Sequence, residues 1–230
     1  MKLKYSWIIF DADGTLFDYV HAETEALRRS MLSAGLHYSE GVLRRYQKIN
    51  IELWKAYERG GIQQEVLRTE RFAVLFDELG MTAVPEEFSE LYLQQLALFG
   101  YLLDGAEDVV ATLAAEVPLL LLTNGIGPVQ RSRLAHSPLR ERFQHVLISS
   151  EIGAAKPSPL IFNAALERMG NPDPAEVLMV GDNFAADIAG AQQCGMDTCW
   201  MNPQNGTAPA GEAPTYEIRF LRDLLPLLQD

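Results

Sequence analysis

Cysteine is scarce in this chain, which has only Cys194 and Cys199 among 230 residues. Their spacing fits neither a redox pair nor a zinc knuckle, so the sequence predicts neither kind of site. Two thiols in a chain of this length favour a reducing compartment, and we therefore expect a cytoplasmic protein.

Long apolar runs are also missing. Lys2 and Lys4 precede only four strongly apolar residues before Asp11 interrupts them, which is too short for a signal peptide. No apolar stretch approaches the length of a membrane span. The sequence therefore predicts neither a secretory leader nor a membrane partner.

Basic residues are the scarcer charge: 19 Lys and Arg stand against 31 Asp and Glu, a formal net charge of −12. An acidic chain repels nucleic acid polymers and anionic membranes, so we expect neither as a partner. A small phosphorylated metabolite remains compatible, because a metal ion and one lysine can reverse the sign locally. With 48% hydrophobic residues, the chain can bury a core for one domain with an insertion or for two small domains.

The periodicity of the apolar residues divides the chain into two kinds of segment. From about Tyr19 to Phe99 the spacing is helical throughout, in stripes that include Leu32, Val66 and Leu79. Elsewhere short apolar runs alternate with helical segments, which is typical of βαβ units and a parallel sheet. We expect strands at 5–10, 117–122, 145–148, 177–180 and near 198–201. The prediction is an α/β fold with a Rossmann-like doubly wound parallel sheet over 1–17 and 101–230, and an all-helical insertion over 18–100.

Two acids follow directly on the first predicted strand. Asp11 and Asp13 gain nothing from packing together, because like charges raise each other's pKa and cost desolvation. The pair makes sense if a cation lies between them, or if one acid is a nucleophile and the other a proton donor. Gly14 permits a sharp turn, and Thr15 adds a hydroxyl and a backbone N–H. The alternative is a solvated Asp-Gly turn.

Polar residues follow other strands in the same way. Thr123, Asn124 and Gly125 offer a hydroxyl, an amide and backbone N–H groups suited to a phosphate, or else form an ordinary helix N-cap. Lys156 is restricted to an extended conformation by Pro157, which can aim its ammonium group, although most lysines lie on the surface.

The strand at 177–180 is followed by Asp182, with Asp187 five residues further on. Either acid alone fits a role in capping a helix or complementing its dipole. In a parallel sheet, however, the acids, the lysine and the hydroxyl–amide pair share one edge, where ligands bind in open α/β sheets. Capping alone does not readily explain that coincidence.

Taken together, these motifs resemble those of the haloacid dehalogenase-like (HAD) hydrolase superfamily over essentially the whole chain. The matching segments are Asp11-Ala12-Asp13-Gly14-Thr15, Leu122-Thr123-Asn124-Gly125, Lys156-Pro157, and Gly181-Asp182 with Asp187. The resemblance implies that residues 18–100 form a C1 cap domain.

The resemblance also implies a mechanism and a Mg²⁺ cofactor. Asp11 would attack phosphorus to form an aspartyl-phosphate, and Asp13 would protonate the leaving group and later activate water. Mg²⁺ would be held by the carboxylates of Asp11 and Asp182 and by the backbone carbonyl of Asp13. The residues implied to bind phosphate are Thr123, Asn124, Gly125 and Lys156. Thr15 and Asp187 are implied to orient the residues that contact the substrate or the metal.

Within the superfamily, the segment with Gln130, Arg133-Leu134, Phe143 and 149–153 resembles the bacterial pyrimidine 5′-nucleotidases, which usually carry Asn where this chain has Gly14. The implied substrate is a nucleoside monophosphate and the implied assembly a monomer or homodimer. Phosphatases of phosphoglycolate, N-acylneuraminate 9-phosphate or sugar phosphates, and sugar phosphomutases, stay open as alternatives. Asp13 argues against a dehalogenase, and the complete set of acids argues against a non-catalytic binding module.

Overall fold

The structure, a computed structural model, describes residues 3–228 and divides into two compact units. One unit comprises the chain up to Tyr19 and from Gly100 onward, and the other is Val20–Phe99. The boundaries expected from the sequence, at 17/18 and 100/101, lie within two residues of this division. Among the described residues, none of the helices combines the length and the apolar character needed to cross a bilayer.

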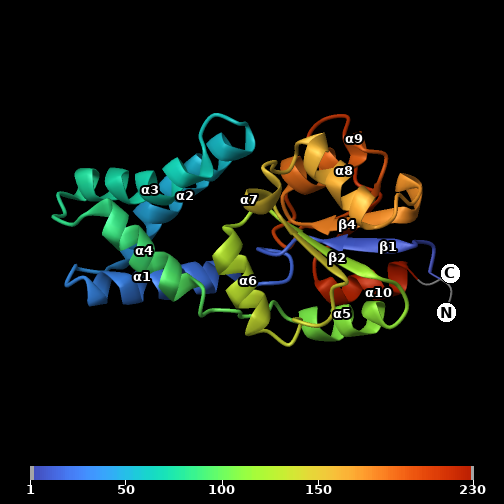
Figure 1. Cartoon of the computed structure of the whole chain (residues 1–230), viewed down its shortest axis with the longest axis horizontal. Coiled ribbons are helices and arrows are strands. Elements are labelled where there is room, and N and C mark those ends of the chain that lie inside the picture. The colour runs from blue at the N-terminus through green and yellow to red at the C-terminus, as the bar shows by residue number, and fades with distance from the viewer. Residues whose placement is uncertain (1–2, 229–230) are drawn as a thin grey trace. The chain divides into compact units, whose positions relative to one another are not determined.

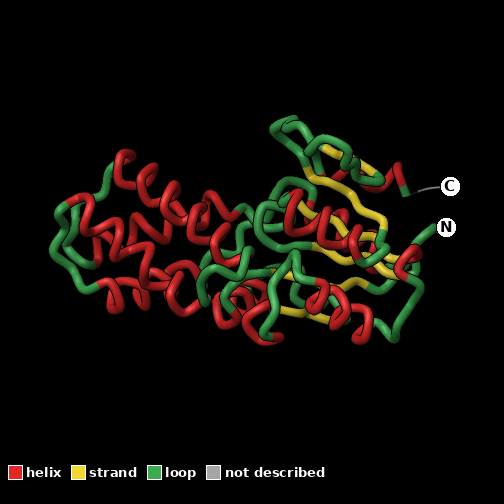
Figure 2. The backbone as a smooth tube through the Cα atoms, turned by 90° about the horizontal axis from the view of Figure 1, so that it is seen from above, coloured by secondary structure: helices red, strands yellow, loops and turns green. Residues whose placement is uncertain are grey.

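The first unit is built on a parallel sheet of six strands in the order β3-β2-β1-β4-β5-β6, which are the yellow segments of Figure 2. The strands are β1 (Trp7–Phe10), β2 (Leu119–Thr123), β3 (His145–Ile148), β4 (Val177–Gly181), β5 (Asp197–Met201) and β6 (Tyr216–Ile218). This order is that of a doubly wound sheet, so the predicted fold class is confirmed. All five predicted strands are present, whereas the short β6 after the Gly- and Pro-rich loop was not predicted.

Helices cover both faces of this sheet (Figure 1). They are α5 (Ala106–Ala114), α6 (Gly127–Ala135), α7 (Ser149–Ile152), α8 (Pro159–Arg168), α9 (Gly190–Gln193) and α10 (Leu224–Leu227), with short 3-10 turns at Pro174–Glu176 and Leu221–Asp223. Between β4 and β5 the chain forms a π-helical turn, η2 (Phe184–Ala189), that continues into α9. This π-helical turn carries Asp187, which therefore lies close to the end of β4.

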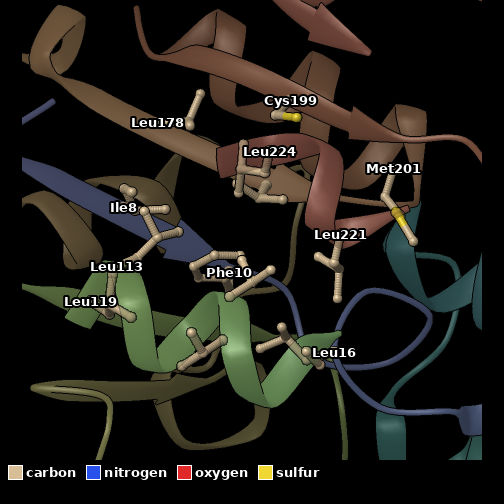
Figure 3. Packing of buried hydrophobic residues seen from close by; sticks show 14 of the residues in the cluster. Ile8, Phe10, Leu16, Leu113, Leu119, Leu178, Cys199, Met201, Leu221 and Leu224 are labelled. Carbon is tan, nitrogen blue, oxygen red and sulfur yellow. The ribbon is translucent and has the colours of Figure 1, made fainter. Parts of the chain in front are cut away.

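The central strands are buried on both sides, as a parallel sheet covered by helices requires. Ile8 and Phe10 of β1 belong to the apolar cluster that contains α5 and α10, where they face Leu113 and Leu224 (Figure 3). The alternate residues of β1, among them Ile9, pack in a second cluster with α8. The side chains on both faces of β1 are therefore buried in the core. The chain beyond Phe10 leaves the sheet at its carboxyl edge.

The second unit is helical throughout, as predicted, and consists of α1 (Tyr19–Ser33), α2 (Glu40–Glu58), α3 (Gln64–Leu79) and α4 (Pro85–Leu96), with the first residue of α1 lying in the other unit. Leu32, Val66 and Leu79, which the helical spacing places on the apolar stripes, are 59%, 48% and 41% exposed. Each lies in the first or last turn of its helix, where the packing of the bundle ends.

A buried polar network lies inside the helical unit. Arg71 is 1% exposed and donates hydrogen bonds to Tyr46 Oη at 3.3 Å and to Asn50 Oδ1 at 3.2 Å. Its guanidinium also lies 4.8 Å from the centre of the Tyr92 ring. Asn50 donates in turn to the buried carboxylate of Glu23 at 2.8 Å. Asn50 therefore links a buried cation to a buried anion.

Replacing Arg71 with Met is expected to lower the free energy of unfolding by about 3–5 kcal/mol, because it leaves the Glu23 carboxylate buried without the cation. Urea denaturation followed by circular dichroism measures this loss. Arg45→Met is the control, since Arg45 pairs with Glu78 on the exposed surface and its removal is expected to change stability little. Equal losses in the two variants would contradict a structural role for the network.

Candidate active site

Three neighbouring strands bring most of the predicted site residues to one edge. Phe10 of β1 lies opposite Leu121 of β2 on one side and Val180 of β4 on the other. Asp11 directly follows β1, Thr123 ends β2 and Asp182 directly follows β4. Because the strands are parallel and in register, their carboxyl ends lie together, as the sequence predicted.

Lys156 is the cation of this cluster. Its side chain is 2% exposed, so it is not a surface lysine. The ammonium lies 2.5 Å from Asp11 Oδ1 and 2.6 Å from Asp187 Oδ1, and it donates to the carbonyl oxygen of Leu122 at 2.9 Å. Burial alone would lower the pKa of Lys156, but the charges of the two aspartates outweigh it and raise the pKa above its usual value. Lys156 therefore stays charged.

Asn124 fixes the backbone that carries Lys156. Its side-chain amide donates to the Lys156 carbonyl at 2.9 Å and accepts from the Lys156 N–H at 2.8 Å. The side-chain amide expected at a phosphate is thus committed to aiming the lysine. Beside it, Thr123 Oγ1 accepts from the Gly125 N–H at 3.2 Å, which shapes the turn after β2.

Three carboxylates share a small volume. Asp11, Asp182 and Asp187 each offer an oxygen within 4.8 Å of the others. Burial, together with the charges of Asp187 and Asp182, raises the pKa of Asp11 well above its ordinary value although Lys156 opposes this. Burial and the charge of Asp187 raise the pKa of Asp182 to about 7. Three acids facing one lysine form a hard-oxygen donor set with excess negative charge, which fits Mg²⁺.

Thr15 and Trp200 support Asp182 from two sides. Thr15 Oγ1 lies 3.3 Å from Asp182 Oδ1, within hydrogen-bonding distance. The indole N–H of Trp200 donates to the Asp182 carbonyl oxygen at 2.9 Å. Trp200, on the neighbouring strand β5, was not among the predicted site residues, because its contribution depends on the order of strands in the sheet.

Two glycines let the acids lie close to the backbone. At Gly14, where φ is 85°, a Cβ would lie 2.4 Å from Asp182 Oδ2. At Gly181 a Cβ would lie 2.3 Å from Asp187 Oδ2. An Asn at position 14 tolerates this φ, but its Cβ requires the Asp182 carboxylate to move. Gly14 therefore sets the distance between the first loop and Asp182.

Asp13 makes contacts that sequence reasoning missed. Its Oδ2 accepts a hydrogen bond from Gln130 Nε2 at 2.5 Å, and its Oδ1 accepts from the guanidinium of Arg133. Both partners lie on α6, three residues apart and therefore on one helix face. Their positions in the segment that resembles nucleotidases were the available signal, but sequence spacing does not show that this face meets the loop after β1.

Comparisons with known proteins show the family to which this chain belongs. Residues 5–195 match the family model for haloacid dehalogenase-like hydrolases. The chain is 35% identical to the pyrimidine 5′-nucleotidase YjjG of Escherichia coli, covering 98% of this chain and 99% of that protein. It is 33% identical to the pyrimidine 5′-nucleotidase PynA of Streptococcus pneumoniae, and the alignment covers 97% of this chain and 95% of PynA.

Among solved structures, the HAD-hydrolase YfnB of Bacillus subtilis, described as bound to magnesium, aligns with a TM-score of 0.92. The two chains are 34% identical, and the alignment covers 97% of this chain and 98% of YfnB. With the family model matching most of the chain and the relatives covering nearly all of it, the protein belongs to the haloacid dehalogenase-like hydrolase family.

Proposed function

We propose that this protein is a Mg²⁺-dependent 5′-nucleotidase that hydrolyses pyrimidine nucleoside monophosphates through an aspartyl-phosphate intermediate. The broader class, a phosphoric monoester hydrolase, follows from its family and from its similarity to nucleotidases over nearly the full chain. The observation that carries the proposal is the buried Lys156 ammonium between Asp11 and Asp187, beside the Asp182 carboxylate. The two nucleotidases supply the substrate class.

In the proposed first step, a carboxylate oxygen of Asp11 attacks phosphorus and the bond to the 5′ oxygen breaks. Lys156 offsets the negative charge of the phosphoryl group, and the turn at Thr123–Gly125 donates hydrogen bonds to its oxygens. Asp11, Asp182 and the backbone carbonyl of Asp13 would hold the Mg²⁺. When bound, the ion reduces the repulsion between the carboxylate and the anionic substrate.

Asp13 transfers protons in both proposed steps. Its carboxyl group gives a proton to the departing 5′ oxygen, which leaves as the nucleoside hydroxyl. Its carboxylate then takes a proton from water, whose oxygen attacks the phosphorus of the intermediate. This second step regenerates the Asp11 carboxylate and releases inorganic phosphate. Asp187 and Thr15 orient Lys156 and Asp182 through the contacts described above.

The helical unit is proposed to act as the C1 cap and to choose the substrate, because the sheet-edge residues contact only the phosphoryl group common to all substrates. The family boundaries assigned from the sequence, 18–100 for the cap and 1–17 with 101–230 for the core, belong to this proposal. A cytoplasmic location and a monomeric or homodimeric state are proposed with it. Cys194 and Cys199 are both free thiols.

A phosphate-release screen tests the substrate proposal. We expect kcat/KM for dUMP, UMP or dTMP to exceed the values for phosphoglycolate, N-acylneuraminate 9-phosphate and sugar phosphates by at least about tenfold. The reason is that a base-binding surface stabilises the transition state of nucleotides only. Purine monophosphates are the matched control for the base. A higher kcat/KM for a non-nucleotide would contradict the nucleotidase proposal, and phosphoryl transfer to a second sugar hydroxyl without phosphate release would indicate a mutase.

A further inference from the structure

We propose that Gln130 and Arg133 are positioning residues that hold Asp13 in the orientation in which it exchanges protons with the leaving group and with water. This inference rests on the proposed role of Asp13 as general acid and base. It extends the site to one face of α6, beyond the strand-end residues found from the sequence.

Both oxygens of Asp13 are engaged by this face of α6. Gln130 Nε2 lies 2.5 Å from Oδ2, and the Arg133 guanidinium forms an ion pair with Oδ1. A carboxylate held at two oxygens by two donors from one rigid helix cannot turn freely about its side-chain bonds. Proton transfer needs a heavy-atom approach of about 2.6–3.2 Å, so this restriction acts on the rate.

Arg133 is itself held in place. Its side chain is fully buried, and its guanidinium lies 4.9 Å from the centre of the Phe17 ring. The Phe17 carbonyl accepts from the Gly14 N–H at 3.0 Å, so the aromatic ring belongs to the same loop as Asp13. By contrast, Arg131 of α6 pairs with Glu151 of α7, and these two side chains are 50% and 40% exposed. Of these two pairs, the Arg133–Asp13 pair is the more buried, at 0% and 24% exposure, and its burial makes the charge pairing restrictive.

Gly125 makes room for Gln130. A Cβ at position 125 would lie 2.2 Å from Gln130 Nε2 and 2.5 Å from its Cγ. The glutamine side chain therefore lies across the Gly125 backbone on its way to Asp13. The glycine in the proposed phosphate-binding turn thus serves a second purpose, because any side chain there would push Gln130 away from the acid.

The chemistry of the pair suits a residue that changes its protonation state. An arginine can only donate, whereas a glutamine amide offers both a donor and an acceptor. Gln130 Oε1 is buried and has no hydrogen-bond partner among residues 3–228. A half-turn of the amide would present this oxygen to the protonated carboxyl of Asp13. Gln130 can therefore hold Asp13 both as the acid and as the carboxylate, while Arg133 fixes the other oxygen.

The test compares leaving groups. A nitrophenolate leaves without a proton, whereas the alkoxide of dUMP needs one, so loss of Asp13 positioning affects kcat/KM for dUMP more than for p-nitrophenyl phosphate. β-Glycerophosphate replaces dUMP if dUMP is not a substrate. We expect Gln130→Met to lower the ratio of kcat/KM for dUMP to kcat/KM for p-nitrophenyl phosphate at least about tenfold, which is part of the 10²–10⁴-fold contribution of general acid catalysis. Gly125→Ala is expected to lower the same ratio.

Three further variants make the result decisive. Asp13→Asn is expected to lower the ratio further, and adding Gln130→Met to it should change the ratio little, because both act through one group. Arg131→Gln, on the exposed face of α6, should leave the ratio unchanged. If Gln130→Met and Gly125→Ala keep the wild-type ratio while Asp13→Asn lowers it, the positioning role is overturned and the proposed function stands. If Asp13→Asn also keeps the ratio, the acid role of Asp13 falls, and this inference with it.

Discussion

Asp11→Asn is expected to reduce kcat by at least about 10⁴-fold, because an amide cannot attack phosphorus and no other group replaces a covalent nucleophile. The substitution is nearly isosteric, and Lys156 keeps its partner Asp187 at 2.6 Å. The fold should therefore survive, although one carboxylate is lost from the acid cluster. Steady-state phosphate release measures the effect, and circular dichroism checks the fold.

A matched acid outside the site provides the control. Asp197 lies at the start of β5, where Lys4 and Tyr5 bind its carboxylate, at the opposite end of the strand from the carboxyl edge. Asp197→Asn should leave kcat within about twofold, because its charge touches none of the reacting groups. Acid quenching of the wild-type reaction should trap one phosphoryl group on the peptide that contains Asp11. Appreciable turnover by Asp11→Asn would assign the nucleophile to another residue.

Removal of Mg²⁺ with EDTA is expected to lower activity by about 10³-fold or more, and added Mg²⁺ should restore it, because the acid cluster needs a cation to accept an anionic substrate. Three carboxylate oxygens lie within 4.8 Å of one another, and Lys156 pairs with two of these acids, Asp11 and Asp187. Asp182→Asn should weaken Mg²⁺ binding, measured by titration calorimetry, while Asp197→Asn should not. Full activity in EDTA would contradict the metal site.

The same site predicts a pH dependence for the metal. Burial and the charge of Asp187 raise the pKa of Asp182 to about 7 in the metal-free protein. Below this pH the carboxylate carries a proton that Mg²⁺ must displace, and above it the carboxylate is already ionised. The affinity for Mg²⁺ should therefore fall as the pH is lowered from 8 to 6 and change little from 8 to 9. Affinity that is constant from 6 to 8 would contradict protonation of this group.

Much of the site was predictable because it depends on strand ends. Residues at the carboxyl ends of neighbouring parallel strands lie at the same edge of the sheet. Asp11, Thr123 and Asp182 could therefore be placed together once the strands were recognised. Lys156 was harder, since it lies in a loop. Only the restriction imposed by Pro157 argued against an ordinary surface lysine, and the structure shows the Lys156 side chain to be 2% exposed.

Other contacts depend on which elements become neighbours. Leu32, Val66 and Leu79 lie on the predicted helical stripes and are nevertheless exposed, because periodicity gives the direction of a side chain but not the extent of the packing around it. Asn124 was expected at a phosphate, yet its amide holds the Lys156 backbone, 32 residues away in the sequence. Such long-range partners leave no local periodicity to detect.

By itself, the sequence determined the parallel sheet, the helical insertion and the acids at the strand ends, because each follows from the order and period of residues along the chain. Only the tertiary structure decided that α6 directs Gln130 and Arg133 to Asp13, that Gly125 and Gly14 leave room for particular side chains, and that Trp200 supports Asp182. These contacts join separate elements. Their geometry is set by how a helix packs beside a loop and how strands are ordered, which residue spacing along the chain does not specify.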